Sequence, residues 1–253
     1  MLGKFELLHS YDEESANLAE SFDCSVVQWF KQSDKIKSGS CIVSLPEGDV
    51  LCFVKAYKTT FFKGLVWRYF NNKVKNIWDI HCDLYIKGVS VPKPIALMRE
   101  KSERNSAEYI ISEWLDNASD MRSSLSGESV SSDEGRGCFI LQAARLLASI
   151  HQLGIVHGDF KYANLMLTST DKRLFSVDFD GAKKKNNKRL FSKDVARFLV
   201  SMAEADMSVK DRDGFLFEYA ASANVGVEAV AGRVEDHYKK IVDRHKIKYP
   251  DRY

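Results

Sequence analysis

The amino-acid sequence predicts a two-lobed α+β fold, with an antiparallel sheet lobe and one main helix over residues 1–115 and a mainly helical lobe over residues 116–253. Two observations predict it. The first half holds five short apolar segments separated by turn signals, whereas apolar residues of the second half recur at helical spacing. A length of 253 residues suits one large domain or two lobes that share a cleft.

Five strands and one helix are expected in the first lobe. Apolar alternation bounded by turn residues predicts the strands, and a helical apolar period that stops at Gly88 predicts the helix. In chain order the expected elements are a strand at 25–30, a strand at 41–45 after a Ser38-Gly39-Ser40 turn, a strand at 50–57, a helix at 74–86, and strands at 95–99 and 108–115. An extended connector, Val91-Pro92-Lys93-Pro94, follows the helix.

The second lobe is expected to begin with a polar loop over residues 119–137, which are rich in Ser, Gly and acids. A long amphipathic helix at 139–153 closes at Gly154. Short strands are expected at 165–167 and 174–177, and helices with a basic end from residue 193 onward.

The composition is that of a soluble globular protein, with 45% hydrophobic and 28% charged residues. The 37 Lys and Arg nearly balance the 35 Asp and Glu, so a basic field over the whole protein is excluded, although local basic patches are not. No nucleic-acid partner is expected. Five scattered cysteines without a CxxC pair predict neither a zinc site nor a disulfide framework. Glu6 stands where a signal peptide needs its apolar core, and no apolar run is long enough to span a membrane. We therefore expect a cytoplasmic protein with reduced thiols.

The most informative stretch is His157-Gly158-Asp159-Phe160-Lys161-Tyr162-Ala163-Asn164, followed by Asp178-Phe179-Asp180 after an apolar strand. It resembles the catalytic core of the protein-kinase-like superfamily, in which H-R-D, an Asn five residues after that Asp, and D-F-G stand at these places. A lone HxD or DFD is common, but the two motifs together, with this spacing and a preceding long helix, favour phosphoryl transfer.

The resemblance implies a role for each polar residue. Asp159 would accept or orient the proton of the attacking hydroxyl, and Lys161 would neutralise charge on the γ-phosphate of ATP. Asn164 and Asp178 supply the hard oxygen ligands that Mg²⁺ prefers.

Upstream residues complete the expected nucleotide site. Lys55 follows alternating apolar residues, as the strand lysine of kinases does, and would hold the α- and β-phosphates; a solvent-facing strand lysine is the alternative. Gly39, in a segment with one glycine, would bring backbone amides to phosphate. Glu113 and Leu115 stand where the kinase hinge would read the adenine edge, unless Glu113 is a strand-end acid without function.

A narrower resemblance is to the bacterial lipopolysaccharide core kinases, which phosphorylate Kdo or heptose. It rests on the strand lysine with a basic-aromatic segment after it, on the connector Gly88-Val89-Ser90-Val91-Pro92-Lys93-Pro94, and on Lys193-Asp194-Val195-Ala196-Arg197-Phe198-Leu199 after the DFD. The resemblance covers roughly residues 36–202. It implies ATP-dependent phosphorylation of a sugar hydroxyl of the lipopolysaccharide inner core at the cytoplasmic face of the inner membrane.

Two basic segments suit an anionic glycolipid acceptor. Residues 57–75 interleave basic and aromatic side chains without an acid, which favours peripheral contact with the inner-membrane surface. The run at 183–189 could hold phosphorylated or carboxylated sugars. Packing of the aromatics in a core and a solvated lysine loop are the competing interpretations.

The sequence departs from the family at one position. Aligning on Trp78 places Ile77 where kinases carry the helix Glu that pairs with the strand lysine. Asp79 or Asp83 could substitute. Two alternatives therefore stay open. The missing Glu favours a nucleotide-binding pseudokinase. An enzyme with another acceptor is the second alternative, since aminoglycoside-type phosphotransferases and the small atypical kinases of tRNA modification also carry HGD. Lys161 counts against these last two, and the complete set of Asp159, Lys161, Asn164 and Asp178 favours an active kinase.

Overall fold

The computed structural model describes residues 5–23, 27–46, 48–58, 73–100, 107–126 and 133–248. These residues form two compact units. The first comprises Met1–Lys87 and Pro92–Leu115, and the second comprises Gly88–Val91 and Asp116–Tyr253. The segment Gly88–Val91, which the sequence placed in the first lobe, therefore lies with the second unit.

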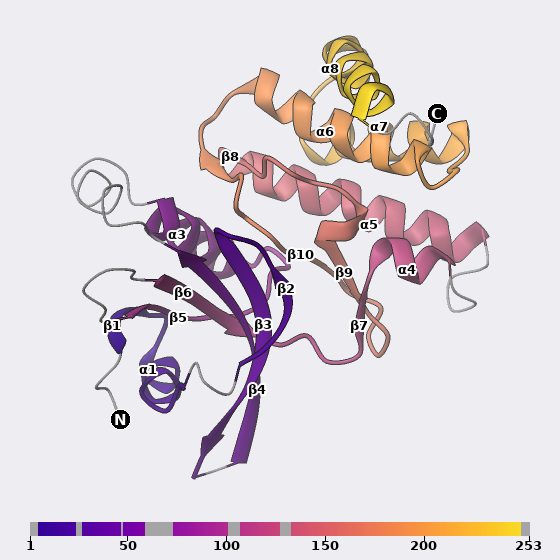
Figure 1. Ribbon diagram of the computed structural model, residues 1–253. Helices are drawn as coiled ribbons and strands as arrows, with labels where there is room; N and C mark the ends of the chain where they lie inside the picture. Colours follow the sequence, from indigo (N-terminus) through magenta and orange to yellow (C-terminus); the bar gives the residue numbers. More distant parts are fainter. Residues whose placement is uncertain are drawn as a thin grey trace. The chain divides into compact units, whose positions relative to one another are not determined.

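The first unit is a six-stranded antiparallel sheet with two described helices (Figure 1). The strand order is β1-β5-β6-β4-β3-β2. The elements are β1 (Phe5–Ser10), α1 (Glu13–Glu20), β2 (Gln28–Gln32), β3 (Ile36–Leu45), β4 (Gly48–Lys58), α3 (Lys73–Ile86), β5 (Pro94–Glu100) and β6 (Ala107–Glu113). This confirms the expected antiparallel sheet and its main helix; β1 and α1 were not predicted.

Strand alternation sorts the sheet residues onto two faces. Val54 and Ala56 of β4 are buried in one core cluster with Leu18 and Ala19 of α1. The intervening residue, Lys55, points to the other face because successive side chains of a strand alternate. One face of the sheet is thus closed by α1, and Lys55 lies on the opposite face.

The expected turn at Ser38-Gly39-Ser40 is wrong. Residues 36–45 form the continuous strand β3, and Gly39 pairs with Val54 on one side and Trp29 on the other. A Cβ at Gly39 would lie 2.5 Å from the carbonyl oxygen of Gln28, so the glycine is required by the close approach of β2 rather than by a turn. The connection from β2 to β3 is made at residues 33–35, where the Ser33 hydroxyl donates to the Ile36 carbonyl oxygen at 2.8 Å.

Helix α3 forms almost as predicted. Its buried residues include Ile77, Ile80 and Leu84, spaced so that they share one helical face, and Gly88 follows at φ +73°. His81, on the same helix, makes a 2.8 Å hydrogen bond to the Pro92 carbonyl oxygen and ties the helix to the connector.

The second unit is mainly helical, as expected. Its elements are β7 (Ala118–Asp120), α4 (Met121–Ser126), α5 (Asp133–Gln152), β8 (Ile155–Val156), η3 (Tyr162–Asn164), β9 (Leu165–Thr168), β10 (Leu174–Ser176), β11 (Lys183–Lys184), α6 (Lys188–Ala203), α7 (Val209–Ser222) and α8 (Val227–Lys248). The small sheet β10-β9-β7 and the pair β11-β8 support the loops between the helices. The expected polar loop at 119–137 is wrong in part, because β7 ends there, α4 lies there, and α5 begins at Asp133.

Aromatic side chains pack the centre of the second unit. Phe160 and Tyr162, which follow the HGD motif, contact Phe198 of α6 with ring centroids 5.3 and 5.0 Å apart, and Phe198 contacts Phe215 of α7. All four are almost fully buried. This packing fixes the chain on both sides of Lys161 to the helical core.

Among the described residues, no helix combines the length and apolarity needed to cross a membrane. Most of the basic-aromatic segment at 57–75 lies outside the described residues, so its membrane contact stays a prediction.

Candidate active site

The HGD loop lies between a short strand and a short helix of the second unit. Strand β8 pairs with β11, so that Val156 stands opposite Lys183, and η3 begins at Tyr162. The loop residues between them are fixed at both ends, which leaves the side chains of Asp159 and Lys161 on a rigid support.

Asp159 is the centre of a small polar cluster. Its Oδ1 lies 2.6 Å from Nη1 of Arg197, and its Oδ2 lies 2.8 Å from Nζ of Lys161. The amide nitrogen of Asn164 donates to the Asp159 carbonyl oxygen at 2.8 Å and to Oδ2 at 3.2 Å. The carboxylate is 34% exposed, so it is held firmly but is open to a partner. Three residues singled out from the sequence therefore meet.

Asp178 is brought to this cluster through the backbone. The Val177 N–H donates to the Asn164 carbonyl oxygen at 3.0 Å, which places the residue before Asp178 against the Asn. Asp178 itself adopts φ +66°, a left-handed conformation that is uncommon for residues other than glycine. Such strained residues cluster at functional sites.

The HGD and DFD segments also touch through two glycines. Gly158 has φ +84°, and a Cβ on it would lie 2.3 Å from the carbonyl oxygen of Gly181. The side chain of Phe179 is buried with its ring centroid 5.3 Å from that of His157. The two motifs are thus packed against each other without space for a larger residue at position 158.

Asp194 of α6 anchors the loop from beneath. It is 1% exposed, and its carboxylate accepts the backbone N–H of His157 at 2.8 Å and that of Gly158 at 3.0 Å. The side chain of His157 makes a 2.9 Å hydrogen bond to the Ser176 hydroxyl. Burial lowers the pKa of His157, and also that of His151, which lies 3.4 Å from Asp194. Both imidazoles are therefore neutral at pH 7, and on this side the loop is held by the His157 hydrogen bond and by the buried carboxylate of Asp194.

Asn164 and Asp178 fit a magnesium ion by the chemistry of their donors. Because Nδ2 of Asn164 is committed to Asp159, its amide oxygen keeps its acceptor capacity. A carboxylate and an amide oxygen are donors that suit Mg²⁺, which otherwise keeps water and phosphate oxygens in its coordination shell.

The residues expected to bind nucleotide in the first unit lie on its sheet. Nζ of Lys55 lies 5.7 Å from the centroid of the Tyr57 ring, and Lys55 pairs across the strands with Ser38, next to Gly39. Glu113 ends β6, where its side chain accepts the Lys93 N–H at 2.9 Å while its own backbone N–H donates to Lys93. Leu115 is the last residue of this unit.

Ile77 is buried, with an exposed fraction of 4%. Of the two acids considered as substitutes for the helix Glu, Asp79 forms an ion pair with Lys75 at 2.7 Å. The structure therefore gives Asp79 a local partner on its own helix.

Sequence reasoning missed the site roles of Asp194 and Arg197. Both lie in the segment at 193–199 that carried the family resemblance, and their spacing of three residues puts them on one face of α6. The available signal was an acid and a cation at that spacing, each beside the apolar residues that α6 buries.

A kinase-like class follows from the fold and from this cluster. The description "Lipopolysaccharide kinase (Kdo/WaaP) family" belongs to a family model that matches residues 49–219, more than half of the chain. The chain therefore belongs to this family, and by class it is a kinase of the lipopolysaccharide core. The predicted fold class, family and enzyme class are confirmed.

The solved structure described as WaaP in complex with acyl carrier protein has the same fold. It matches with a TM-score of 0.62 and 16% sequence identity, over 94% of this chain and 97% of that one. The search of curated proteins gave no match.

Proposed function

We propose that the protein transfers the γ-phosphate of ATP to a sugar hydroxyl, of Kdo or heptose, in the lipopolysaccharide inner core. The observation that carries the proposal is the meeting of Lys161, Asn164 and Arg197 on the carboxylate of Asp159. A carboxylate held in one orientation and partly exposed suits the acceptance of a proton from a hydroxyl.

Each residue of the cluster has a task in this mechanism. Asp159 orients the sugar hydroxyl and takes its proton as the oxygen attacks phosphorus. The side chain of Lys161 is 41% exposed and forms an ion pair with Asp159 at 2.8 Å. It can turn to the transferred phosphoryl group and offset the negative charge of that group. Asn164 and Asp178 would hold magnesium, which when bound neutralises charge on the phosphate oxygens.

The first unit supplies the nucleotide contacts in this proposal. Lys55 binds the α- and β-phosphates, the strand segment around Gly39 covers them, and the backbone of Glu113 and Leu115 pairs with adenine. Ile77 leaves Lys55 without the usual helix Glu, so Lys55 is oriented by other groups.

The acceptor places the reaction at a membrane surface. Lipopolysaccharide intermediates are lipid-anchored, so we propose that the enzyme works peripherally at the cytoplasmic face of the bacterial inner membrane, with residues 57–75 as the contact segment.

The test is transfer of labelled phosphate from ATP to dephosphorylated lipopolysaccharide core in the presence of magnesium. Wild type should transfer, and Asp159→Ala and Asp178→Ala should each lose at least about 99% of kcat, since a general base alone contributes roughly 10²–10⁴-fold. Asp159→Ala should still bind ATP. Asp213→Asn, an exposed acid on α7, is the matched control and should keep full activity.

Two results would contradict the proposal. Full activity of Asp159→Ala would remove that residue as the base. A folded wild type that binds ATP but transfers to no lipopolysaccharide core would contradict the assigned acceptor.

A further inference from the structure

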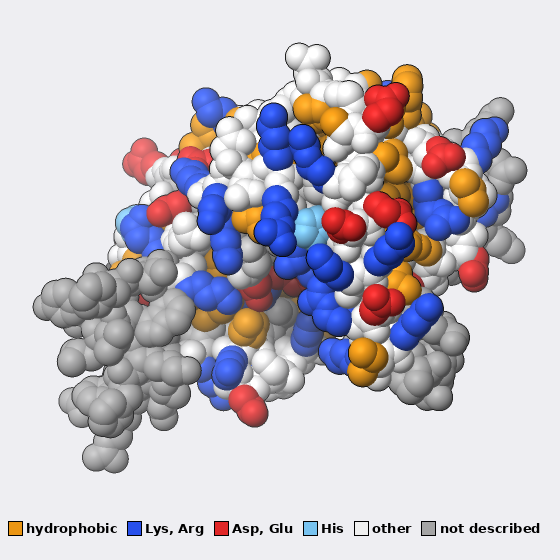
Figure 2. Space-filling model, turned by 90° about the horizontal axis from the view of Figure 1, so that it is seen from above, with side chains coloured by type: hydrophobic (Ala, Val, Ile, Leu, Met, Phe, Trp, Pro, Cys, Tyr) orange, Lys and Arg blue, Asp and Glu red, His pale blue; other side chains and the backbone are white. Residues whose placement is uncertain are grey.

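A cationic pocket lies between the start of α6 and the middle of α8, away from the HGD loop. Its volume is about 330 Å³, and it is lined by Arg189, Arg233, Asp236, His237 and Lys240. Since a water molecule takes about 30 Å³ in the liquid, the pocket has room for one small anion with its hydration water. Figure 2 looks onto the side that carries α6 and α8, where Lys and Arg side chains gather.

Helical spacing brings these side chains together. Arg233, His237 and Lys240 recur at intervals of four and three residues, so they form one stripe on α8. That stripe runs beside the buried residues Val234 and Ile241, which belong to the apolar face of the helix. The three polar groups therefore flank the buried apolar face of α8, where Arg189 at the start of α6 lines the same pocket.

The three cations of this pocket, Arg189, Arg233 and Lys240, line it together with one carboxylate, that of Asp236. In the part of the chain that the structure describes, no ion pair joins Arg189, Arg233 or Lys240 to an acid. Other cations of the same unit have partners, for example Arg145 with Glu218 at 2.6 Å and Lys239 with Glu235 at 3.1 Å. Because Arg189, Arg233 and Lys240 line one pocket, their like charges repel one another, which is unfavourable for the folded state unless an anion binds between them.

The start of α6 adds to the positive potential. Its N-cap is Asn187, and its first turn carries Lys188 and Arg189 and no acid. The helix macrodipole puts partial positive charge at this end, so cations here are unfavourable for stability and favourable for binding an anion.

The imidazole of His237, which lies between Arg233 and Lys240 on α8, is affected by the positive charge of the pocket. Partial burial and the charges of Arg189, Lys240 and Lys193 lower the pKa of His237, while Asp236 acts in the opposite direction. The cations of both helices thus lower the pKa of His237 by more than Asp236 raises it.

We propose that this pocket is a subsite for a phosphate or similar anionic group carried by the acceptor, distinct from the hydroxyl that is phosphorylated. The proposal rests on the function proposed above, since it assigns the pocket to the same substrate. Arg233 and Arg189 would donate hydrogen bonds to the anion, and Lys240 would add a third positive charge.

Helix α6 joins the subsite to the catalytic cluster. Arg189 and Arg197 are eight residues apart on this helix, which corresponds to about 12 Å along its axis. An acceptor of several sugars can span that distance. Cations from two helices line this one pocket, which suits a single anionic group on a saccharide.

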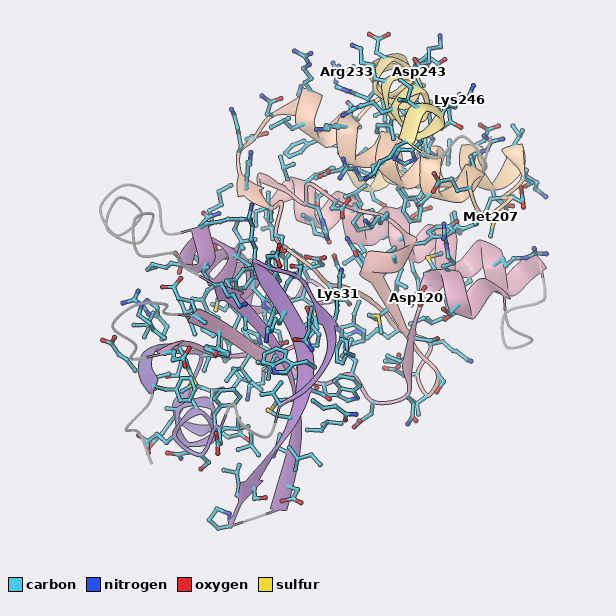
Figure 3. The ribbon with its side chains drawn as sticks, viewed as in Figure 1. Lys31, Asp120, Met207, Arg233, Asp243 and Lys246 are labelled. Carbon is cyan, nitrogen blue, oxygen red and sulfur yellow. The ribbon has the colours of Figure 1, made fainter. Side chains whose placement is uncertain are left out.

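The first test is binding of inorganic phosphate to the full chain, followed by the NMR titration of His237. Phosphate should raise the pKa of His237 in wild type, because an added anion favours the protonated ring. Arg233→Gln/Lys240→Gln should abolish the shift. Lys239→Gln/Lys246→Gln removes the same charge from other positions of α8 and should keep it; Figure 3 labels Arg233 and Lys246. This readout does not depend on kinase activity, and an unchanged His237 pKa in wild type would overturn the subsite.

The second test separates the source of the anion by kinetics. With a phosphate-bearing lipopolysaccharide core as acceptor, Arg233→Gln/Lys240→Gln should raise KM for the acceptor about tenfold or more, as expected for lost charge-assisted hydrogen bonds, with kcat and KM for ATP unchanged. An acceptor without that phosphate should show no difference between variant and wild type.

If acceptor KM stays the same while binding to vesicles of phosphatidylglycerol is lost, the anion belongs to membrane lipid and the acceptor assignment is wrong. If the chain transfers no phosphate but the His237 shift persists, the proposed function fails and the anion site stands.

Discussion

Arg197 donates from one nitrogen, Nη1, both to Oδ1 of Asp159 and to the carbonyl oxygen of Gly158, each at 2.6 Å. The two acceptors belong to consecutive residues of the HGD loop. Asp194, one turn earlier on α6, accepts the loop's backbone N–H groups. Helix α6 therefore supplies both kinds of partner for the loop. The carboxylate of Asp194 accepts hydrogen bonds from the loop's N–H groups, and the guanidinium of Arg197 donates to its oxygen atoms.

We predict that Arg197→Met lowers kcat about 10- to 100-fold, since a small misplacement of a catalytic group has effects of this size. KM for ATP should change little. Arg197→Lys should recover part of kcat, because an ammonium group can still reach one of the two acceptors. Steady-state kinetics beside thermal unfolding checks this: a loss of activity that only follows the loss of folded protein would assign Arg197 a purely structural role.

Gly158→Ala should destabilise the protein by more than about 2 kcal/mol and abolish transfer. The left-handed conformation alone disfavours a side chain by roughly 1–2 kcal/mol, and the new Cβ meets the backbone of Gly181. Gly214→Ala, in the interior of α7 where a Cβ meets nothing within 4 Å, is the matched control and should stabilise by about 0.5–1 kcal/mol. Urea unfolding measures both, and equal effects of the two substitutions would contradict the packing at Gly158.

Ile77→Glu should not restore a kinase-like ion pair with Lys55. Ile77 is buried in α3, so a carboxylate there would be desolvated, at a cost of several kcal/mol. Ile86→Glu, at a position 61% exposed on the same helix, should change stability by no more than about 0.5 kcal/mol. An Ile77→Glu protein with unchanged thermal stability and raised activity would show that position 77 can face Lys55.

Acid should weaken the first unit through His81. Burial lowers the pKa of His81 from 6.5 to about 4, so the folded protein holds the ring neutral and the unfolded chain binds a proton first. The free energy of unfolding is therefore unaffected by His81 above about pH 6.5 and decreases as the pH falls toward 4. The total decrease is about 3 kcal/mol. Urea unfolding at pH 7.5 and pH 5 should show a smaller pH effect in His81→Gln than in wild type. An identical pH effect in the two proteins would refute the neutral buried ring.

Elements with a regular local pattern of apolar residues were predictable from the sequence. Helices α3 and α5 and strands β9 and β10 follow from local pattern, because each buries one regular face. Strand β1 and helix α1 were missed. Helix α1 has only eight residues, and its buried residues Leu18 and Ala19 pack against the sheet, so a helix this short depends on tertiary contacts.

Gly39 shows why a local signal can mislead. Ser38-Gly39-Ser40 is typical of a turn, yet the glycine lies within β3 because the backbone of β2 approaches it closely. The approach involves Gln28 on the neighbouring strand β2, and the pairing of β2 with β3 cannot be derived from the local sequence around Gly39.

The chemistry of the site was partly predictable for a related reason. Asp159, Lys161 and Asn164 lie within six residues of one another, and the resemblance of this stretch to a kinase catalytic loop singled them out; the structure brings the three side chains together. Arg197 is 38 residues from Asp159 in sequence, and only the fold brings the two side chains into contact. Long-range pairs of this kind cannot be derived from composition or period.

Helix α6 carries the groups that hold the HGD loop and also Arg189 of the proposed anion subsite. Because a helix turns by about 100° per residue, one amino acid inserted between Arg189 and Arg197 would move Arg189 to another side of the helix while leaving the loop anchored. Evolution can therefore vary the loops around α6 in length, but this stretch of eight residues is bound to a constant length, and the two ends must change together or not at all.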